Sequence, residues 1–240
     1  MRSWNLAALH GVAAHREEKH LDDGSHSRRK RGSLSPDEIV AAALRLLDGE
    51  GESALTFTRL GAELKASPTA VYRHFASRQD LVLAIADTLD GISLDGYVPT
   101  DDWRADLNDL AWRAWKVAEE HPAAAAIAMG LNTNGINELR AVDAVLRALH
   151  MRGLRGRDAV AHYQVYSNLV LAAAAAHGAR LASSQGEPTE GGWVQSYSPA
   201  DPTRYPYAEA VKVELRLVDD KEIFSRQVAM LLGVLSPATS

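Results

Sequence analysis

Polar and basic side chains that could contact a nucleic acid are concentrated between residues 67 and 78. Arginine guanidinium groups pair with phosphate oxygens and guanine edges, and hydroxyl groups donate hydrogen bonds to phosphates. No aspartate or glutamate lies between Lys65 and Gln79, so no carboxylate in this stretch would repel a phosphate backbone. The candidate DNA contacts here are Ser67, Thr69, Ala70, Tyr72, Arg73, His74 and Arg78.

A second basic group is the run Arg28, Arg29, Lys30 and Arg31. Residues 28–79 hold nine Lys and Arg against six Asp and Glu, a net charge of +3, whereas the whole chain is at −5 and the rest of it at −8. A basic arm just ahead of a DNA-binding helix can enter the minor groove. The alternative is that this run is a solvated tail that contacts no DNA. The net positive charge of the segment that follows it favours the DNA-contacting arm.

The elements that would position these side chains are two short helices joined by a tight turn. Thr56 can cap the first helix, whose apolar face is spaced as a helix requires by Phe57, Leu60, Gly61 and Leu64. Ser67 as N-cap and Pro68 as the first helical residue predict a second helix that runs to about Phe75. The turn is then about three residues long, which is typical of a helix-turn-helix.

Two further helices are expected around this pair. Ser35 and Glu38 can form a capping box that starts a helix ending near Asp48. Ser77 and Asp80 can form another, which starts a helix leading out of the unit to Leu89. The sequence therefore predicts three short helices and an exit helix, the three being Ser35 to Asp48, Thr56 to Leu64 and Pro68 to Phe75.

The pattern T-x-x-x-L-x-x-x-L followed by S-P-T-A-V-Y-R-H-F-A-S-R-Q-D-L resembles the DNA-binding domain of the TetR family of bacterial repressors. The resemblance is close from Ser35 to about Leu89 and holds only in outline beyond. It implies an all-helical homodimer that occupies an operator and releases it when a small molecule binds the larger domain. It also implies that Tyr72 contacts a phosphate, that Arg78 replaces a phosphate-contacting lysine, and that DNA contacts extend to Thr58 and Arg59.

Two positions depart from the family pattern. Lys65 stands where the turn usually has glycine, so a residue with a side chain would adopt a left-handed backbone at a cost on the order of 1 kcal/mol. Gly61 stands where alanine is common. A glycine weakens the helix by about 0.5 to 1 kcal/mol but permits the two helices to pack closely.

Length and composition agree with an all-α protein of two domains. The 240 residues divide into an extension with the basic arm (1–32), the helix-turn-helix domain (33–90) and a helical ligand-binding and dimerisation domain (99–238). In the last of these, helices are expected from Asp101 or Asp102 to Glu120, up to Met129, and at Glu138 to Met151, Asp158 to Ala182, Tyr207 to Val218 and Lys221 to Leu235. The Gly- and Pro-rich stretch between Ser183 and Pro206 is expected to be a long loop.

A ligand cavity is expected among the helices of the second domain. Apolar pockets with a few polar anchors are the usual form of such sites. The candidate lining residues are Trp112, Trp115, Met129, Asn132, Tyr163, Tyr166 and Asn168. Trp112, Trp115 and Met129 could equally be plain core, and Trp193 and Tyr197 in the long loop could close over the pocket.

The helices at 158–182 and 221–235 are too rich in apolar residues for one subunit to cover. We therefore expect a homodimer that binds a palindromic operator of double-stranded DNA, because two-fold symmetry sets the two recognition helices about one DNA turn apart. A large monomeric core is the alternative.

The function expected from these features is a DNA-binding repressor released by a small-molecule inducer. An activator, or a repressor controlled by a protein partner, remains the alternative, and an architectural DNA-binding protein would have no use for the acidic second domain. The chain has no cysteine, no phosphate-binding glycine loop, no nucleophile elbow and no HExxH or CxxC motif, so we expect no enzyme, cofactor or metal site. No membrane association is expected, and the expected location is the bacterial cytoplasm, at the nucleoid.

Overall fold

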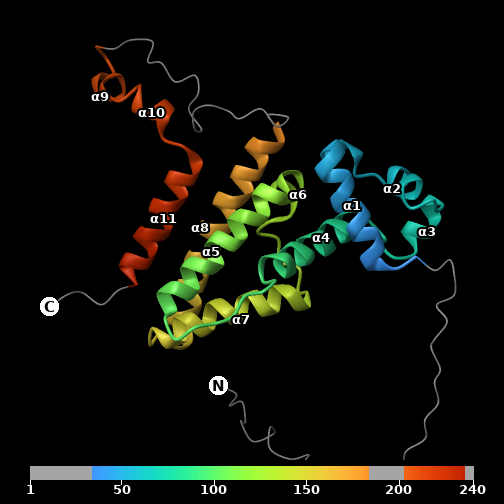
Figure 1. Ribbon diagram of the computed structural model, residues 1–240, viewed down its shortest axis with the longest axis horizontal. Helices are drawn as coiled ribbons and strands as arrows, with labels where there is room; N and C mark the ends of the chain where they lie inside the picture. Colours follow the sequence, from blue (N-terminus) through green and yellow to red (C-terminus); the bar gives the residue numbers. More distant parts are fainter. Residues whose placement is uncertain (1–33, 184–202, 236–240) are drawn as a thin grey trace, which may run out of the picture. The chain divides into compact units, whose positions relative to one another are not determined.

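The computed structural model describes residues 34–183 and 203–235, and all regular structure in these ranges is helical (Figure 1). The all-α fold expected from the sequence is confirmed. In chain order the elements are α1 (Pro36–Glu50), the short 3-10 helix η1 (Glu52–Ala54), α2 (Phe57–Glu63), α3 (Pro68–Tyr72), α4 (Arg78–Ser93), α5 (Trp103–Glu120), α6 (Pro122–Ala128), α7 (Ile136–Met151), α8 (Gly156–Ser183), α9 (Pro206–Ala210), α10 (Glu214–Leu217) and α11 (Asp220–Val234).

The first four α-helices start at the caps that the sequence predicts. The Ser35 and Ser77 side chains each form a capping box, and the Thr56 hydroxyl accepts a hydrogen bond from the Arg59 amide at 3.1 Å. Each cap satisfies an amide that has no partner within its own helix. Local sequence alone therefore fixes where these helices begin.

Helix α3 is shorter than the helix predicted from Pro68 to Phe75, because it ends at Tyr72. The His74 amide bonds to the Val71 carbonyl at 3.0 Å, which tightens the last turn before the chain extends towards the next cap. Val71 and Phe75 are both buried, as their spacing predicts. The end of the helix is thus a compact turn that still anchors its apolar side in the core.

The turn between α2 and α3 depends on two unusual residues. Lys65 has a φ of 50°, which confirms the left-handed backbone expected there. A Cβ added to Gly61 would lie 2.8 Å from the Ala66 carbonyl oxygen and 3.2 Å from the Pro68 nitrogen. Because a real Cβ does not approach backbone atoms so closely, glycine is required for this approach of the two helices.

Replacing Lys65 with glycine is expected to stabilise the protein by about 1 kcal/mol, because glycine adopts a left-handed backbone without steric cost. Thermal unfolding checks this, with Lys65→Ala as the matched control that removes the charge and keeps the strain. A melting temperature for Lys65→Gly no higher than that of Lys65→Ala would contradict the prediction.

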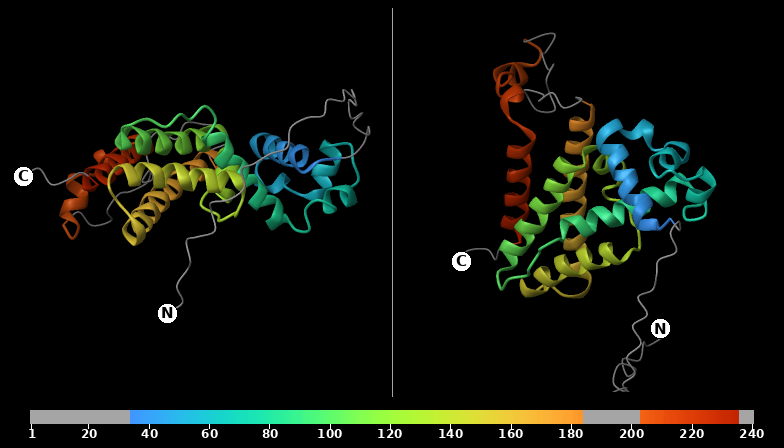
Figure 2. Two further views of the ribbon diagram at one scale, coloured as in Figure 1. Left: turned by 90° about the horizontal axis from the view of Figure 1, so that it is seen from below. Right: turned by 45° about the vertical axis from the view of Figure 1, so that its right-hand side comes forward.

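Helices α6, α7 and α11 pack against α5 and α8, which run side by side (Figures 1 and 2). Helix α6 approaches α8 closely, since a Cβ on Gly178 would lie 2.8 Å from the Pro122 carbonyl oxygen. Alanines at 123, 124 and 128 of α6 join the core cluster of α1 and α4. The apolar core of the helix-turn-helix unit therefore continues into the second set of helices.

A buried ion pair ties the start of α5 to α7. The Asp106 carboxylate is only 1% exposed and lies 2.9 Å from the Arg147 guanidinium. It also accepts hydrogen bonds from the backbone amide and the hydroxyl of Thr100, at 2.8 and 2.7 Å. A buried charge needs this degree of pairing, and the pairing fixes the angle at which two helices of the cavity wall meet.

The expected helix from Tyr207 to Val218 is wrong as a single element, because residues 211–213 form a turn between α9 and α10. Val211 and Val213 are β-branched and exposed, so they weaken the helix without gaining burial in return. The other helices agree with the expectation to within two residues at nearly every end. Trp193 and Tyr197 of the expected loop lie outside the described residues.

Candidate DNA-binding surface and ligand cavity

The exposed side of α2 and α3 carries most of the predicted DNA contacts. Thr58, Thr69, Tyr72, Arg73 and His74 are all exposed. Phosphates and base edges can therefore reach these side chains without any rearrangement of the core. The basic run Arg28 to Arg31 lies outside the described residues.

Tyr72 is held in a fixed orientation although it is 57% exposed. Its ring meets the edge of the buried Phe57 ring at a centroid distance of 4.4 Å and an interplanar angle of 70°. Such an edge-to-face pair restricts the phenol ring. The hydroxyl group of Tyr72 is thus presented at a defined place on the surface.

Two of the predicted contacts have other roles in the structure. Ala70 is buried, with 8% of its surface exposed, so its methyl group belongs to the core. The expectation that Ala70 contacts DNA is therefore corrected. The Ser67 hydroxyl is engaged as the N-cap of α3, accepting a hydrogen bond from the Ala70 amide at 3.3 Å. Helical periodicity turns Ala70 inward one residue ahead of Val71.

Arg59 and Arg78 are paired with carboxylates. Arg59 contacts Glu50 through its Nε at 3.1 Å and Glu63 through a terminal nitrogen at 3.4 Å, and its hydrogen bond lowers the pKa of Glu50. Arg78 lies 2.8 Å from Glu52. Exposed ion pairs of this kind contribute little to stability, so a phosphate can take the place of the carboxylate.

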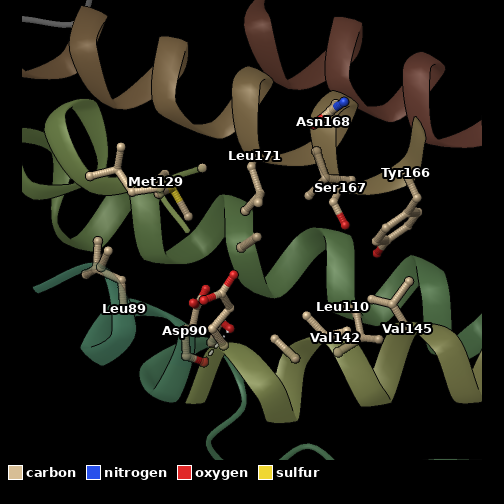
Figure 3. A pocket seen from close by; sticks show the side chains of 18 of the residues that line it. Leu89, Asp90, Leu110, Met129, Val142, Val145, Tyr166, Ser167, Asn168 and Leu171 are labelled. Atoms are coloured by element: carbon tan, nitrogen blue, oxygen red, sulfur yellow. Dashed lines mark hydrogen bonds between the residues drawn. The ribbon is translucent and has the colours of Figure 1, made fainter. Parts of the chain in front are cut away.

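A cavity of about 420 Å³ lies between α4, α5, α7, α8 and the segment that follows α6 (Figure 3). Its walls are largely apolar. Leu89 and Leu94 come from α4 and the residue after it, Leu110 and Ala114 from α5, and further wall residues are Val142, Val145, Val170 and Leu171. The volume is in the range that holds a drug-sized molecule.

Five of the seven predicted pocket residues line this cavity, namely Met129, Asn132, Tyr163, Tyr166 and Asn168. Trp112 and Trp115 do not, which corrects the expectation for them. Their rings pack on the other side of α5 against Phe224 of α11, at centroid distances of 5.1 and 4.5 Å. The helical period shows which residues of α5 share a face, but it does not show which face packs against α11.

The Tyr166 hydroxyl, although in the cavity wall, is already engaged. It donates a hydrogen bond to the Leu107 carbonyl at 2.6 Å, and burial raises the pKa of this tyrosine. Burial also raises the pKa of Tyr163. Both tyrosines are therefore neutral at physiological pH.

The sequence reasoning missed two acidic residues of the cavity wall, Asp90 on α4 and Glu138 on α7. Burial raises the pKa of Asp90 to about 7, and the neighbouring charges of Asp87 and Glu138 add to the effect. An acid directly after the buried Leu89 was the available signal, because a carboxyl group beside a core position has few places to reach water.

Asp87 caps the start of α7 from the neighbouring helix α4. Its carboxylate accepts hydrogen bonds from the backbone amides of Asn137 and Glu138, both at 3.0 Å, and from the Asn137 side chain at 3.1 Å. The Glu138 carboxylate in turn accepts from the Thr133 amide at 2.7 Å. A negative charge at a helix N-terminus is stabilising, so these contacts hold α4 and α7 together beside the cavity.

A second polar contact links the helix-turn-helix unit to α5. His121, at the end of α5, lies 2.9 Å from the Asp48 carboxylate of α1 through its Nδ1. The α1 and α4 helices therefore both make polar contacts with the helices that follow them.

Comparison with known families agrees with this architecture. Residues 39–85 match the family model of bacterial regulatory proteins of the tetR family, and residues 96–233 match that of the tetracyclin repressor-like C-terminal domain. The second match covers more than half of the chain. The chain belongs to the TetR family of bacterial transcriptional regulators.

An HTH-type transcriptional regulator of Saccharopolyspora erythraea is 32% identical over 151 residues, which is 62% of this chain and 63% of that protein. The tetracycline repressor protein class A of Escherichia coli is 31% identical over 129 residues, 53% of this chain and 59% of that protein. The chain thus spans about three fifths of the length of these two curated relatives.

Among solved structures, a TetR of Streptomyces coelicolor superposes with a TM-score of 0.64 at 25% identity, over 84% of this chain and 97% of that one. Every helix of residues 34–183 and 203–235 is too short or too polar to cross a lipid bilayer.

Replacing Asp90 with asparagine is expected to stabilise the protein at pH 8, with a gain that disappears near pH 4. The folded-state pKa of about 7 lies above 3.8, the usual pKa of an aspartate, so wild-type stability falls as the pH rises between these values. The gain is on the order of a few kcal/mol above pH 7. Unfolding curves across this range check it. Asp143→Asn, an exposed acid on α7, is the control, and a gain that does not change with pH would refute the assignment.

Replacing Gly135 with alanine is expected to destabilise the protein by about 1 to 3 kcal/mol. The new Cβ would lie 2.0 Å from the Asp87 carboxylate, which must then leave its hydrogen bonds to α7. Chemical denaturation measures the change. Gly49→Ala is the matched control, because nothing lies within 4 Å of a Cβ there, and it should stabilise α1. Equal effects of the two variants would argue against the cap.

Proposed function

We propose that this protein is a sequence-specific repressor that leaves its operator when a small molecule fills the cavity. The observation that carries the proposal is the course of α4. This helix of 16 residues begins at Arg78, beside the exposed recognition surface, and its last two turns line the cavity with Ala86, Leu89, Asp90 and Ser93. One rigid element therefore borders both sites.

In the proposed complex, α3 enters the major groove. Thr69, Arg73 and His74 face the base edges, and Tyr72 and Arg78 contact phosphates on either side. Further contacts come from α2 and the turn, through Thr58, Arg59 and Ser67, and from the arm formed by Arg28, Arg29, Lys30 and Arg31. Arg59 and Arg78 exchange their carboxylate partners for phosphate oxygens on binding.

The proposed repressor is a homodimer that recognises a palindromic operator. Apolar side chains remain exposed on α8 and α11, among them Val160 (53%), Val165 (55%), Met230 (72%) and Val234 (80%). Large exposed apolar surfaces of this kind mark an interface. A second copy would cover them and would set the two recognition helices about 34 to 36 Å apart, one turn of DNA.

Release follows from a shift of α4. A ligand that occupies the cavity pushes α4 away from α5 or α7. Because α4 is continuous, the recognition helix α3, which precedes the first turn of α4 and shares its apolar cluster through Val71, moves with it. Two recognition helices that change their separation can no longer fit successive major grooves. A coupling of about 1 to 3 kcal/mol is enough for such a switch.

Gel-shift titration with the DNA upstream of its own gene tests the DNA-binding half of this proposal. Arg73→Ala is expected to lose about 1 to 3 kcal/mol of affinity for the operator and little for random DNA, because Arg73 faces the bases. Arg78→Ala is the control for a phosphate contact. It should weaken binding to the operator and to random DNA alike, and should reduce the slope of log affinity against log salt concentration by about one. Equal loss on random DNA for Arg73→Ala would reject base reading.

A further inference from the structure

The charge in the cavity wall is of one sign. Asp90 and Glu138 line the cavity, and within residues 34–183 and 203–235 no Lys, Arg or His is among the lining side chains. The remainder of the wall is apolar or carries neutral groups such as Asn132 and Tyr163. An anionic ligand would meet negative charge in this low-dielectric space, which disfavours its binding on electrostatic grounds.

The three acids at this end of the cavity differ in what they contact. Asp87 uses its carboxylate to cap α7, and Glu138 accepts hydrogen bonds from the Thr133 and Asn134 amides, at 2.7 and 2.6 Å. In contrast, no donor within the described part of the chain bonds to the Asp90 carboxylate. Figure 3 shows Asp90 at the α4 side of the pocket, with Leu171 of α8 on the opposite side.

We propose that the cavity takes an apolar ligand bearing a protonated amine, with the ammonium group paired to Asp90. The inference rests on the proposed role of the cavity as the ligand site and adds the chemical class. The ammonium supplies the missing donor to Asp90, and its positive charge offsets the repulsion among Asp87, Asp90 and Glu138. The apolar walls from α5 and α8 hold the hydrocarbon body.

The pairing makes binding depend on pH. The titratable groups near Asp90 are Asp87 on its own helix, Glu138 on α7 and Tyr163 on α8, while α5 contributes the apolar Leu110 and Ala114. The pKa of Asp90 is about 7 in the unliganded protein. An ammonium group binds its ionised form, so affinity for an amine is expected to rise about tenfold from pH 6 to pH 8.

The test uses three probes that share one apolar body and differ in the polar group: 4-phenylbenzylamine, 4-phenylbenzyl alcohol and 4-phenylbenzoate. Calorimetric titration of the full chain is expected to give the amine an affinity about tenfold or more above that of the alcohol, and above that of the carboxylate. Asp90→Asn should remove this preference and the pH dependence. Asp143→Asn, which changes the net charge equally, should leave both intact.

The inference is overturned if the amine fails to bind, if the alcohol or the carboxylate binds as tightly, or if Asp90→Asn keeps the preference for the amine. A gel shift with the same probes separates the two proposals. Amine binding that needs Asp90 and leaves operator affinity unchanged supports the inference and contradicts ligand release. A neutral or anionic probe that releases the operator supports ligand release and contradicts the inference.

Discussion

The carboxylate of Asp87 is the interaction on which the arrangement of the two sites depends. It belongs to α4, whose first turn borders the recognition surface, and it caps α7, which forms one wall of the cavity. Gly135 leaves just enough room for it, since any Cβ there would occupy the position of the carboxylate. A charge at a helix N-terminus is stabilising only in a narrow range of positions, so this cap fixes the distance between α4 and α7.

The same cap places the negative charge of Asp87 near that of Asp90 in the cavity wall, where the two carboxylates repel each other. Asp87 and Glu138 both have partners, whereas Asp90, one turn further along α4, faces the cavity near both charges and has a raised pKa. Asp90 is half-buried and has no donor among the described residues, so its charge lowers the stability of the empty protein. A ligand that supplies a donor would offset this cost. An asparagine or a leucine in place of Asp90 would make the empty protein more stable.

A second link joins the helix-turn-helix unit to the helices around the cavity. His121 joins the end of α5 to Asp48 of α1, and the alanines of α6 pack in the same core cluster as α1 and α4. The helix-turn-helix unit is thus held to the larger set of helices by apolar packing on one side and by polar caps on the other. In the proposed switch, movement of α4 relative to α5 and α7 redistributes these contacts.

The sequence by itself determined the helix starts, the turn and the exposed basic surface, because caps, prolines and the left-handed Lys65 act within a few residues of one another. It also predicted five of the residues in the cavity wall, since apolar and amide side chains on neighbouring helices tend to meet. Only the tertiary structure decided that Trp112 and Trp115 face α11, that Ala70 points inward, and that Asp87, Asp90 and Glu138 gather at one end of the cavity. Asp87 and Glu138 are about 50 residues apart in the chain, and no local pattern brings such groups together; the packing of α4 against α7 does.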